Sequence, residues 1–213
     1  MRSFLKVSLL SALTLALPTV LAGQVRVGVR GGLSIATLGG DDAGDVDSRT
    51  GLNVGGFLNV PVAGIVGVQL GAGFTEKGSQ ETELGVDWEF ALDYFEVPLL
   101  LTLSPPMTGN VGFHFLIGPA LSFRASCTAS GRQGGVQVSL DCKHPDIGAP
   151  LKSFDLGAMA GVGLEIGVAS NISLVIDGFY NLGLTKIDDS GVDDDVKNRA
   201  LSVLAGLSFS LGG

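Results

Sequence analysis

The chain has 213 residues, of which 46% are hydrophobic and only 16% are charged, and this length suits a single β-barrel domain. Its 33 glycines argue against long helices, because each glycine costs about 1 kcal/mol in a helix interior. The net charge of −8 argues against nucleic-acid binding, which requires basic residues that neutralise phosphates.

Residues 1–22 have the features of a secretory signal peptide. Two basic residues near the start precede an apolar stretch over 9–17, and Val20-Leu21-Ala22 supplies the small residues that a signal peptidase requires. We therefore expect cleavage after residue 22 and an exported domain over 23–213. Beyond residue 22 no uninterrupted apolar run reaches 18 residues, so the sequence predicts no transmembrane helix.

The segment Val66–Gly78 alternates between two kinds of side chain. One face is apolar, whereas glycine, Gln69 and Thr75 occupy the other, because a strand places successive side chains on opposite faces of a sheet. An apolar outer face suits lipid, and small polar residues suit a crowded interior. Similar alternation recurs along the chain and predicts eight strands at 24–36, 50–60, 65–77, 88–103, 111–124, 153–168, 171–184 and 199–211.

The connections between these strands alternate in length. Three are short turns, at 60–64, 104–109 and 169–171. Four are long and polar, at 37–49, 78–87, 125–152 and 185–198. This arrangement is typical of bacterial outer-membrane barrels, which have short periplasmic turns and longer extracellular loops.

We therefore predict an all-β fold, an eight-stranded antiparallel up-and-down transmembrane β-barrel in the bacterial outer membrane, with periplasmic termini and extracellular loops. Because a bilayer penalises unpaired strand edges, the last strand is expected to pair with the first, near Val25–Ile35. A soluble ligand-binding barrel is the alternative fold, and it would need apolar side chains inside. The expected aromatic girdle comprises Phe74, Phe95, Phe123, Tyr180 and Phe209, while Trp88 is placed in or beside a loop.

An eight-stranded barrel has a lumen that side chains can fill, so charges inside it need partners. Residues of both signs occur at positions expected to face inward. We predict that they form a lumenal ion-pair network that plugs the barrel: Arg26, Arg30, Lys77, Glu96, Arg124, Asp155, Glu165 and Asp177. Ordinary structural pairs with no role in transport are the alternative.

Cys127 and Cys142 are the two cysteines of the chain. In an exported protein, two cysteines most simply form one disulfide. Two free thiols are the alternative, and a zinc site near His144 lacks a fourth ligand. We predict neither a metal nor a cofactor.

Four motifs occur in a fixed order: Lys77-Gly78, Tyr94-Phe95-Glu96-Val97-Pro98-Leu99-Leu100, Gly118-Pro119-Ala120 and Tyr180-Asn181-Leu182-Gly183-Leu184-Thr185. Together they resemble the PorT-like outer-membrane β-barrel family, over essentially the whole mature chain. The resemblance implies the fold, the outer-membrane location and support of a secretion apparatus, but little chemistry. The last strand, Gly206–Leu211, is similar to the signal read by the barrel-assembly machinery, although no aromatic residue ends the chain.

We predict no enzymatic activity. A lipid-modifying enzyme would need a nucleophile and a base within hydrogen-bond reach. His114 falls near the periplasmic end, and Ser139, Asp141 and His144 have no spacing that fixes a triad. The acidic loops match no EF-hand and are expected to be solvated rather than to bind calcium; they contain Asp41, Asp42, Asp45, Asp47, Asp188, Asp189, Asp193, Asp194 and Asp195.

The predicted function is that of a structural or surface-interaction barrel that supports envelope integrity or secretion. A small-solute pore is the main alternative, followed by a lipid-modifying enzyme. The expected partners are outer-membrane lipid and lipopolysaccharide, the barrel-assembly machinery during insertion, and a protein at the extracellular loops.

Overall fold

The computed structural model describes residues 24–41, 43–44, 46–142, 144, 151–189 and 195–211. The predicted signal peptide lies outside these residues, as do Asp42, Asp45, Asp193 and Asp194 of the acidic loops. Among the described residues, no helix has the length and apolar character needed to cross a membrane.

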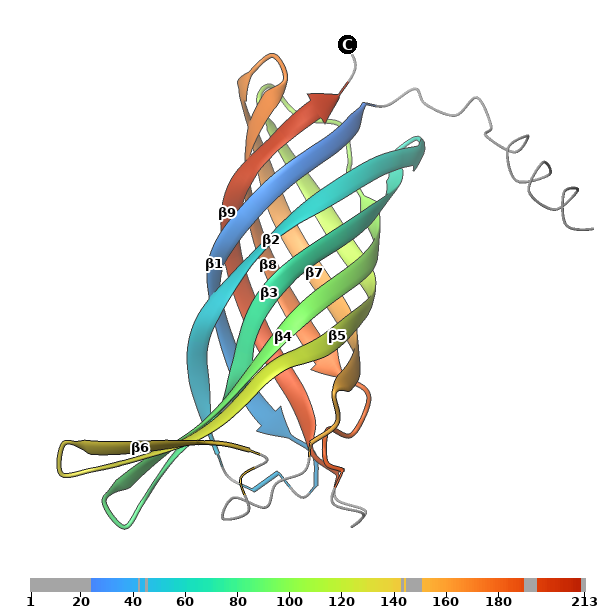
Figure 1. Ribbon diagram of the computed structural model, residues 1–213. Coiled ribbons are helices and arrows are strands. Elements are labelled where there is room, and N and C mark those ends of the chain that lie inside the picture. The colour runs from blue at the N-terminus through green and yellow to red at the C-terminus, as the bar shows by residue number, and fades with distance from the viewer. Residues whose placement is uncertain are drawn as a thin grey trace, which may run out of the picture.

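Nine antiparallel strands form within this part of the chain: β1 Val25–Gly39, β2 Asp47–Ala63, β3 Val66–Glu83, β4 Val86–Leu103, β5 Val111–Gln133, β6 Val136–Asp141, β7 Phe154–Ala169, β8 Ile172–Gly183 and β9 Lys197–Leu211. Eight of them close into a ring in the order β1-β2-β3-β4-β5-β7-β8-β9 (Figure 1), and β6 pairs with β5 outside the ring. The ring closes between β1 and β9, where Val25 pairs with Leu211. The predicted eight-stranded antiparallel barrel, with its last strand beside its first, is confirmed.

The two faces of the wall have the predicted polarity. On β1, Val29 and Leu33 point outward and are 61% and 53% exposed, whereas Arg30 and Ser34 point inward and are buried. The same alternation places Phe113, Phe115 and Ile117 outside. The branched and aromatic side chains therefore surround the cylinder. This excludes the soluble ligand-binding barrel, which would need them inside.

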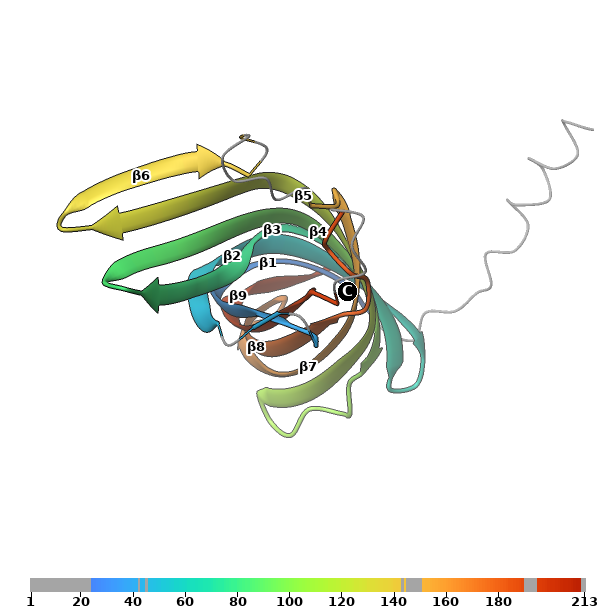
Figure 2. The same ribbon diagram turned by 90° about the horizontal axis from the view of Figure 1, so that it is seen from below.

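The two ends of the barrel differ. At one end, here called the turn end, short connections join β2 to β3, β4 to β5 and β7 to β8, and β1 begins beside the end of β9. At the opposite end, here called the hairpin end, the β3–β4 and β5–β6 hairpins project sideways beyond the cylinder (Figures 1 and 2). The difference in length between the two ends matches the sequence prediction.

Two of the four predicted long loops are wrong, because the chain there continues as strands. Residues 78–87 belong to β3 and β4 except for a two-residue turn at Leu84-Gly85, and much of 125–152 forms the end of β5 and all of β6. Trp88 accordingly lies within β4, paired with Glu81 and Gly131, rather than in a loop. These segments were missed because their faces do not have the polarity of the barrel wall.

Candidate functional site

The lumen near the turn end contains two ion pairs between strands that are not neighbours in the ring. Arg26 of β1 bonds to Glu165 of β7. One level further in, Arg30 of β1 lies 2.6 Å from Asp177 of β8, and both side chains are buried. His114 of β5 contacts the second oxygen of Asp177, with its Nε2 atom 2.7 Å from Oδ1. Asp177 therefore has a partner on each carboxylate oxygen.

The guanidinium of Arg30 also lies between two aromatic rings. Its Cζ atom is 5.0 Å from the centre of the Phe57 ring and 4.5 Å from that of Phe179. Cation–π attraction is stronger where water is excluded. Arg30 is thus held by an anion and by two aromatic faces, and it occupies the cross-section of the lumen together with an apolar cluster comprising Leu100, Leu116, Ala120, Met159, Phe179 and Leu204.

Towards the hairpin end, Glu96 of β4 is the centre of a third group. Lys77 donates to its Oε1 atom over 2.7 Å, and the other three donors are Thr75, Ser122 and Asn181, at 2.8, 2.8 and 2.9 Å. A buried carboxylate surrounded by donors from three neighbouring or facing strands is satisfied without water. Glu96 lies in the Tyr-x-Glu motif singled out in the sequence, and its structural role is to join these strands across the lumen.

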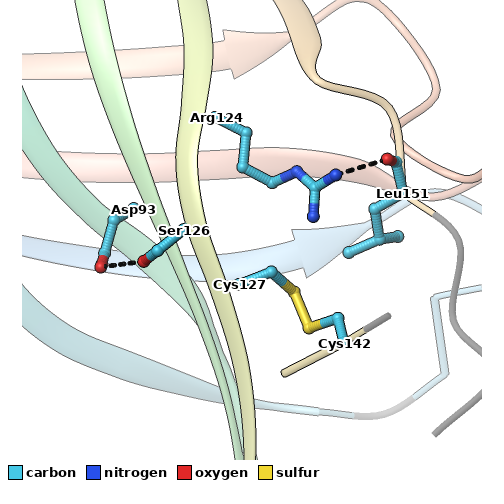
Figure 3. The surroundings of a disulfide bond; sticks show 6 residues. All are labelled: Asp93, Arg124, Ser126, Cys127, Cys142 and Leu151. Carbon is cyan, nitrogen blue, oxygen red and sulfur yellow. Dashed lines mark hydrogen bonds between the residues drawn. A yellow bond between two sulfur atoms is a disulfide. The ribbon is translucent and has the colours of Figure 1, made fainter. Parts of the chain in front are cut away.

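The other two predicted lumenal residues, Asp155 and Arg124, form hydrogen bonds with neutral groups in the described part of the chain. Asp155 accepts hydrogen bonds from Thr185 over 2.6 Å and from Asn198 over 2.9 Å. Arg124 donates to the backbone carbonyl of Leu151 over 2.6 Å (Figure 3). The structure thus brings six of the eight predicted residues into three ion pairs, and places the other two in separate hydrogen-bonded positions nearer the hairpin end.

Several hydrogen-bond partners in this arrangement were not predicted from the sequence, among them His114 and Asn181. His114 was considered only as a possible catalytic base. The sequence feature that could have placed it in the lumen is its position on the inward-facing side of β5. Asn181 was given no lumenal role. Neither omission could be corrected without the register, since His114 and Asp177 are 63 positions apart and Glu96 and Asn181 are 85 apart.

A buried apolar cluster lies at the hairpin end of the barrel. It is drawn from strands and connections around the ring and comprises Leu92, Tyr94, Cys127, Cys142 and Ile187, with Leu38, Leu151 and Val196 packed against it. The disulfide between Cys127 and Cys142 lies in this cluster, with a Cα–Cα distance of 5.5 Å (Figure 3). It fixes the segment after β6 to the inner face of β5 and so holds this cluster in place.

The free space in the lumen is correspondingly small. Next to Arg30 and Asp177 lie two cavities of about 20 and 40 Å³, the first of which has room for a single water molecule. A larger cavity of about 650 Å³ lies at the turn end, where Arg26 and Glu165 form part of its lining.

A row of aromatic residues encircles part of the outer wall. Phe74 pairs with Phe95, Phe95 with Phe123 and Phe123 with Phe154, so that four neighbouring strands each contribute one ring. The Phe123 and Phe154 ring centres are 5.6 Å apart. Aromatic girdles mark the interface between the bilayer and water. Three of the five expected members lie in this row; Tyr180 and Phe209 also point outward, with Phe209 near the turn end.

From this row, β4 continues to Leu103 at the turn end. The outward side chains of that stretch are apolar, and Leu99 and Leu101 are about half exposed. Its nine residues match the length of a tilted strand that spans a bilayer. The aromatic row, together with the apolar belt between this row and the turn end, therefore defines the lipid-facing part of the barrel.

Beyond the row, the polarity of the two faces reverses. We call this part the projecting sheet; it comprises Ser79–Glu83, Val86–Ala91, Thr128–Gln133 and Val136–Asp141. The face that continues the lipid-facing side is polar and includes Asp87, Glu89, Ser130 and Arg132. The face that continues the lumenal side has exposed apolar residues: Trp88, Phe90, Val136 and Val138, at 40%, 36%, 68% and 58%.

This reversal has a physical cause. Within the bilayer the outer face meets lipid, whereas beyond the aromatic row it meets water and is polar. The exposed apolar residues on the other face lie outside both the lipid belt and the closed lumen. β3 continues nine residues past Phe74, which extends the chain about 30 Å beyond the row at the usual rise of a strand.

The tip of the β3–β4 hairpin is strained. Leu84 has a φ of +52° and is 93% exposed. Turns of this length favour asparagine or glycine at such a position, because a larger side chain crowds its own backbone. A strained, fully exposed leucine contributes nothing to the core and is therefore available for contact with another molecule.

The residues considered as a possible catalytic triad, Ser139, Asp141 and His144, lie in and just after β6. Ser139 lies on β6, where its hydroxyl is 2.8 Å from that of Ser130, and His144 bonds through its backbone to the carbonyl of Asp141. No group of three or more metal-ligating side chains occurs in the described part of the chain. In the acidic connection before β9, Asp195 forms an ion pair with Lys197 over 2.6 Å, and the hydrogen bond from this lysine lowers the pKa of the Asp195 carboxyl.

A closed ring with a charged interior, an apolar belt and an aromatic row defines a transmembrane β-barrel of the outer-membrane class. The chain belongs to the outer membrane protein beta-barrel domain family, whose model matches residues 17–189. It is an outer-membrane protein. No curated protein matches it in sequence.

Two solved structures show the same fold. Neisserial surface protein A is 13% identical, with a TM-score of 0.52, and the match covers 88% of this chain and 97% of that one. A major outer membrane protein from Thermus thermophilus is 15% identical, with a TM-score of 0.51, and the match covers 89% of this chain and all of that one. At these identities the likeness concerns the fold alone.

Proposed function

We propose that this protein is a non-enzymatic outer-membrane barrel that acts at the cell surface through its projecting sheet. The observation that carries this function is the reversal of polarity beyond the aromatic row. It leaves Trp88, Phe90, Val136 and Val138 exposed to water, where they stabilise neither the barrel nor its insertion into lipid. Exposed apolar patches on soluble surfaces are typical of interaction sites.

In this proposal the hairpin end faces out of the cell and the turn end faces the periplasm. The support is that outer-membrane barrels have short periplasmic turns and longer extracellular connections. The similar Neisserial protein is called a surface protein. The strained leucine at the tip of the β3–β4 hairpin would then be among the residues farthest from the membrane.

A small-solute pore is disfavoured by the contents of the lumen. The Arg30–Asp177 pair, the Lys77–Glu96 pair and the apolar cluster at the hairpin end lie one after another along the barrel. A hydrated ion would have to break buried pairs, each of which loses several kcal/mol when one charge is left alone. We therefore propose that the lumenal residues plug the barrel.

The narrower assignment to PorT-like proteins, with support of secretion as its function, rests on the four sequence motifs. One of them has a structural reason: Gly78 has a φ of +122°, and a Cβ atom there would lie 1.8 Å from the Phe90 carbonyl oxygen. That reason concerns folding at the base of the projecting sheet. A secretion role would use the same surface, with a component of the apparatus as the partner.

The orientation is tested by inserting a short epitope between Leu84 and Gly85 and, as the matched control, between Gly64 and Ile65 at the turn end. We expect antibody to label intact cells that carry the first insertion, and to label the second only after permeabilisation. The opposite result would contradict the proposal. Planar-bilayer recordings test the plug: large and steady conductance of the unmodified barrel would favour the pore.

A further inference from the structure

β6 is an edge strand. Among the described residues it pairs with β5 on one side and with nothing on the other, at the end of the strand order. Edge strands present unpaired backbone groups to which another chain can add a strand. In Figure 2 this edge of β6 faces away from the rest of the molecule. In the described part of the chain, this edge of the β6 backbone is therefore open to a partner.

The turn before β6 shows which backbone groups face that edge. Gly134 and Gly135 both have positive φ angles and form a two-residue hairpin loop closed by Gln133 and Val136. In such a hairpin the closing residues exchange hydrogen bonds, and the bonding then alternates along the antiparallel pair. The N–H and C=O groups of Val136 and Val138 therefore point to β5, and those of Gln137 and Ser139 point to the free edge.

The side chains of β6 specify what an added strand must offer. Val136, Val138 and Leu140 share one face with Trp88 and Phe90 of β4, across Gly131 and Ala129 of β5. The ring of Trp88 lies over Gly131, where a Cβ atom would be 2.9 Å from it. An added strand with apolar residues at alternate positions would extend this apolar row, because neighbouring side chains on one face of a sheet pack together.

The charge of the projecting sheet indicates which polar residues should alternate with the apolar residues of the added strand. The projecting sheet contains five acidic residues and one basic residue, Arg132. Asp87, Glu89 and Asp141 lie on its polar face, where Arg49 of β2 already pairs with Glu89, and Glu81 and Glu83 lie on its apolar face. Arg132 already donates to the side chain of Gln137 over 2.7 Å. A cationic segment is attracted by this surface and an acidic one is repelled. A second copy of this chain would bring the same acidic sheet against itself, so we disfavour it as the occupant.

We propose that the free edge of β6 binds an extended segment of another protein, in which apolar residues alternate with lysine or arginine, by adding it as a further strand. This inference rests on the proposed surface function and names the chemistry of its partner. The edge is preorganised, because the two-residue turn fixes one end of β6 and the Cys127–Cys142 disulfide fixes the other. Backbone bonds provide the affinity and the alternating side chains provide the specificity.

The test uses the full-length chain, refolded in detergent micelles, and a fluorescent peptide of alternating valine and lysine as the probe. Ser139→Pro removes an N–H group that points to the free edge, while the β5–β6 ladder depends on the neighbouring positions; proline is tolerated on edge strands. We expect Ser139→Pro to weaken peptide binding at least tenfold. Ser139→Ala, which loses the same hydroxyl but keeps the N–H, should bind within twofold of the unmodified protein.

Two further probes complete the test. A peptide methylated on alternate backbone nitrogens should lose binding if backbone bonds are used, and a valine–glutamate peptide should bind at least tenfold more weakly. Equal binding to the Ser139→Pro and Ser139→Ala variants, or equal binding of both charge forms, would overturn the proposal. A dimer in the absence of peptide that Ser139→Pro dissociates would also overturn it, in favour of a second copy as the occupant. If the Leu84–Gly85 epitope is surface-accessible but these peptides fail, the strand-addition inference fails and the surface function stands.

Discussion

Removing the charge of Asp177 should destabilise the barrel more than removing the charge of Arg30. Asp177 is 1% exposed, and its carboxylate bonds to both Arg30 and His114, at 2.6 and 2.7 Å. Arg30 is 9% exposed, and Asp177 is its anionic partner in the described structure. Asp177→Asn therefore leaves a buried cation with no counter-charge, whereas Arg30→Met leaves a carboxylate that still has His114.

The expected magnitudes follow from this asymmetry. Leaving one charge of a buried pair without its partner costs about 3–5 kcal/mol, which we expect for Asp177→Asn. Arg30→Met keeps an apolar stem between Phe57 and Phe179 and removes one charged hydrogen bond, for which we expect about 1–3 kcal/mol. The double variant Arg30→Met with Asp177→Leu should lose less stability than Asp177→Asn alone, because well-packed apolar residues can substitute for a buried ion pair.

The assay is urea unfolding of the barrel in phospholipid vesicles, followed by the far-ultraviolet circular dichroism of the strands. Trp88 fluorescence is unsuitable, because the only tryptophan lies in the projecting sheet and not in the barrel wall. The reasoning is refuted if Asp177→Asn costs less than about 1 kcal/mol, since the pair would then not be buried as described. It is refuted equally if Arg30→Met proves the more damaging change.

Three further predictions concern the wall, the tip and the disulfide. Leu99→Arg, in the middle of the apolar belt, should destabilise the inserted barrel by about 2–4 kcal/mol in the same urea assay. Leu84→Arg, at the hairpin tip, should leave the free energy of unfolding unchanged. Equal effects of the two variants would contradict the assigned belt. Leu84→Asn should relieve about 1 kcal/mol of backbone strain, seen as roughly fivefold slower amide exchange at the tip, and unchanged exchange would count against the strain. Cys142→Ser removes a crosslink between residues 15 apart, which is worth about 3 kcal/mol. Protease should therefore cut β6 faster, while the circular dichroism of the barrel stays the same. An unchanged cleavage rate would show that the disulfide does not hold β6.

The barrel wall could be predicted from sequence because its signal is local. A strand with lipid on one side and a crowded lumen on the other must alternate with a period of two, and β1, β5 and β7 do so over most of their lengths. The same pattern fixed which face is apolar, how many strands form the ring and which connections are short. It also selected the charged residues that lie inside, since they interrupt the inward-facing positions.

The projecting sheet could not be predicted in the same way. Its strands still alternate, but water replaces lipid on the outer face and the polarity reverses, so 78–87 and the end of β5 had the appearance of polar loops. A polar segment with exposed apolar residues is compatible with a loop or with a strand. Pairing between β3, β4, β5 and β6 decides between them, and pairing is a property of the folded chain.

The partners inside the lumen were likewise decided by the tertiary structure. Arg30 and Asp177 are 147 positions apart, and nothing in either strand specifies the other. Ring closure and strand register bring β1 within reach of β8, two places away around the ring, and set which levels of the two strands face each other. Alternation along a strand depends only on neighbouring residues and the solvent on each side, whereas the choice of a partner across the barrel depends on the register of every strand between them.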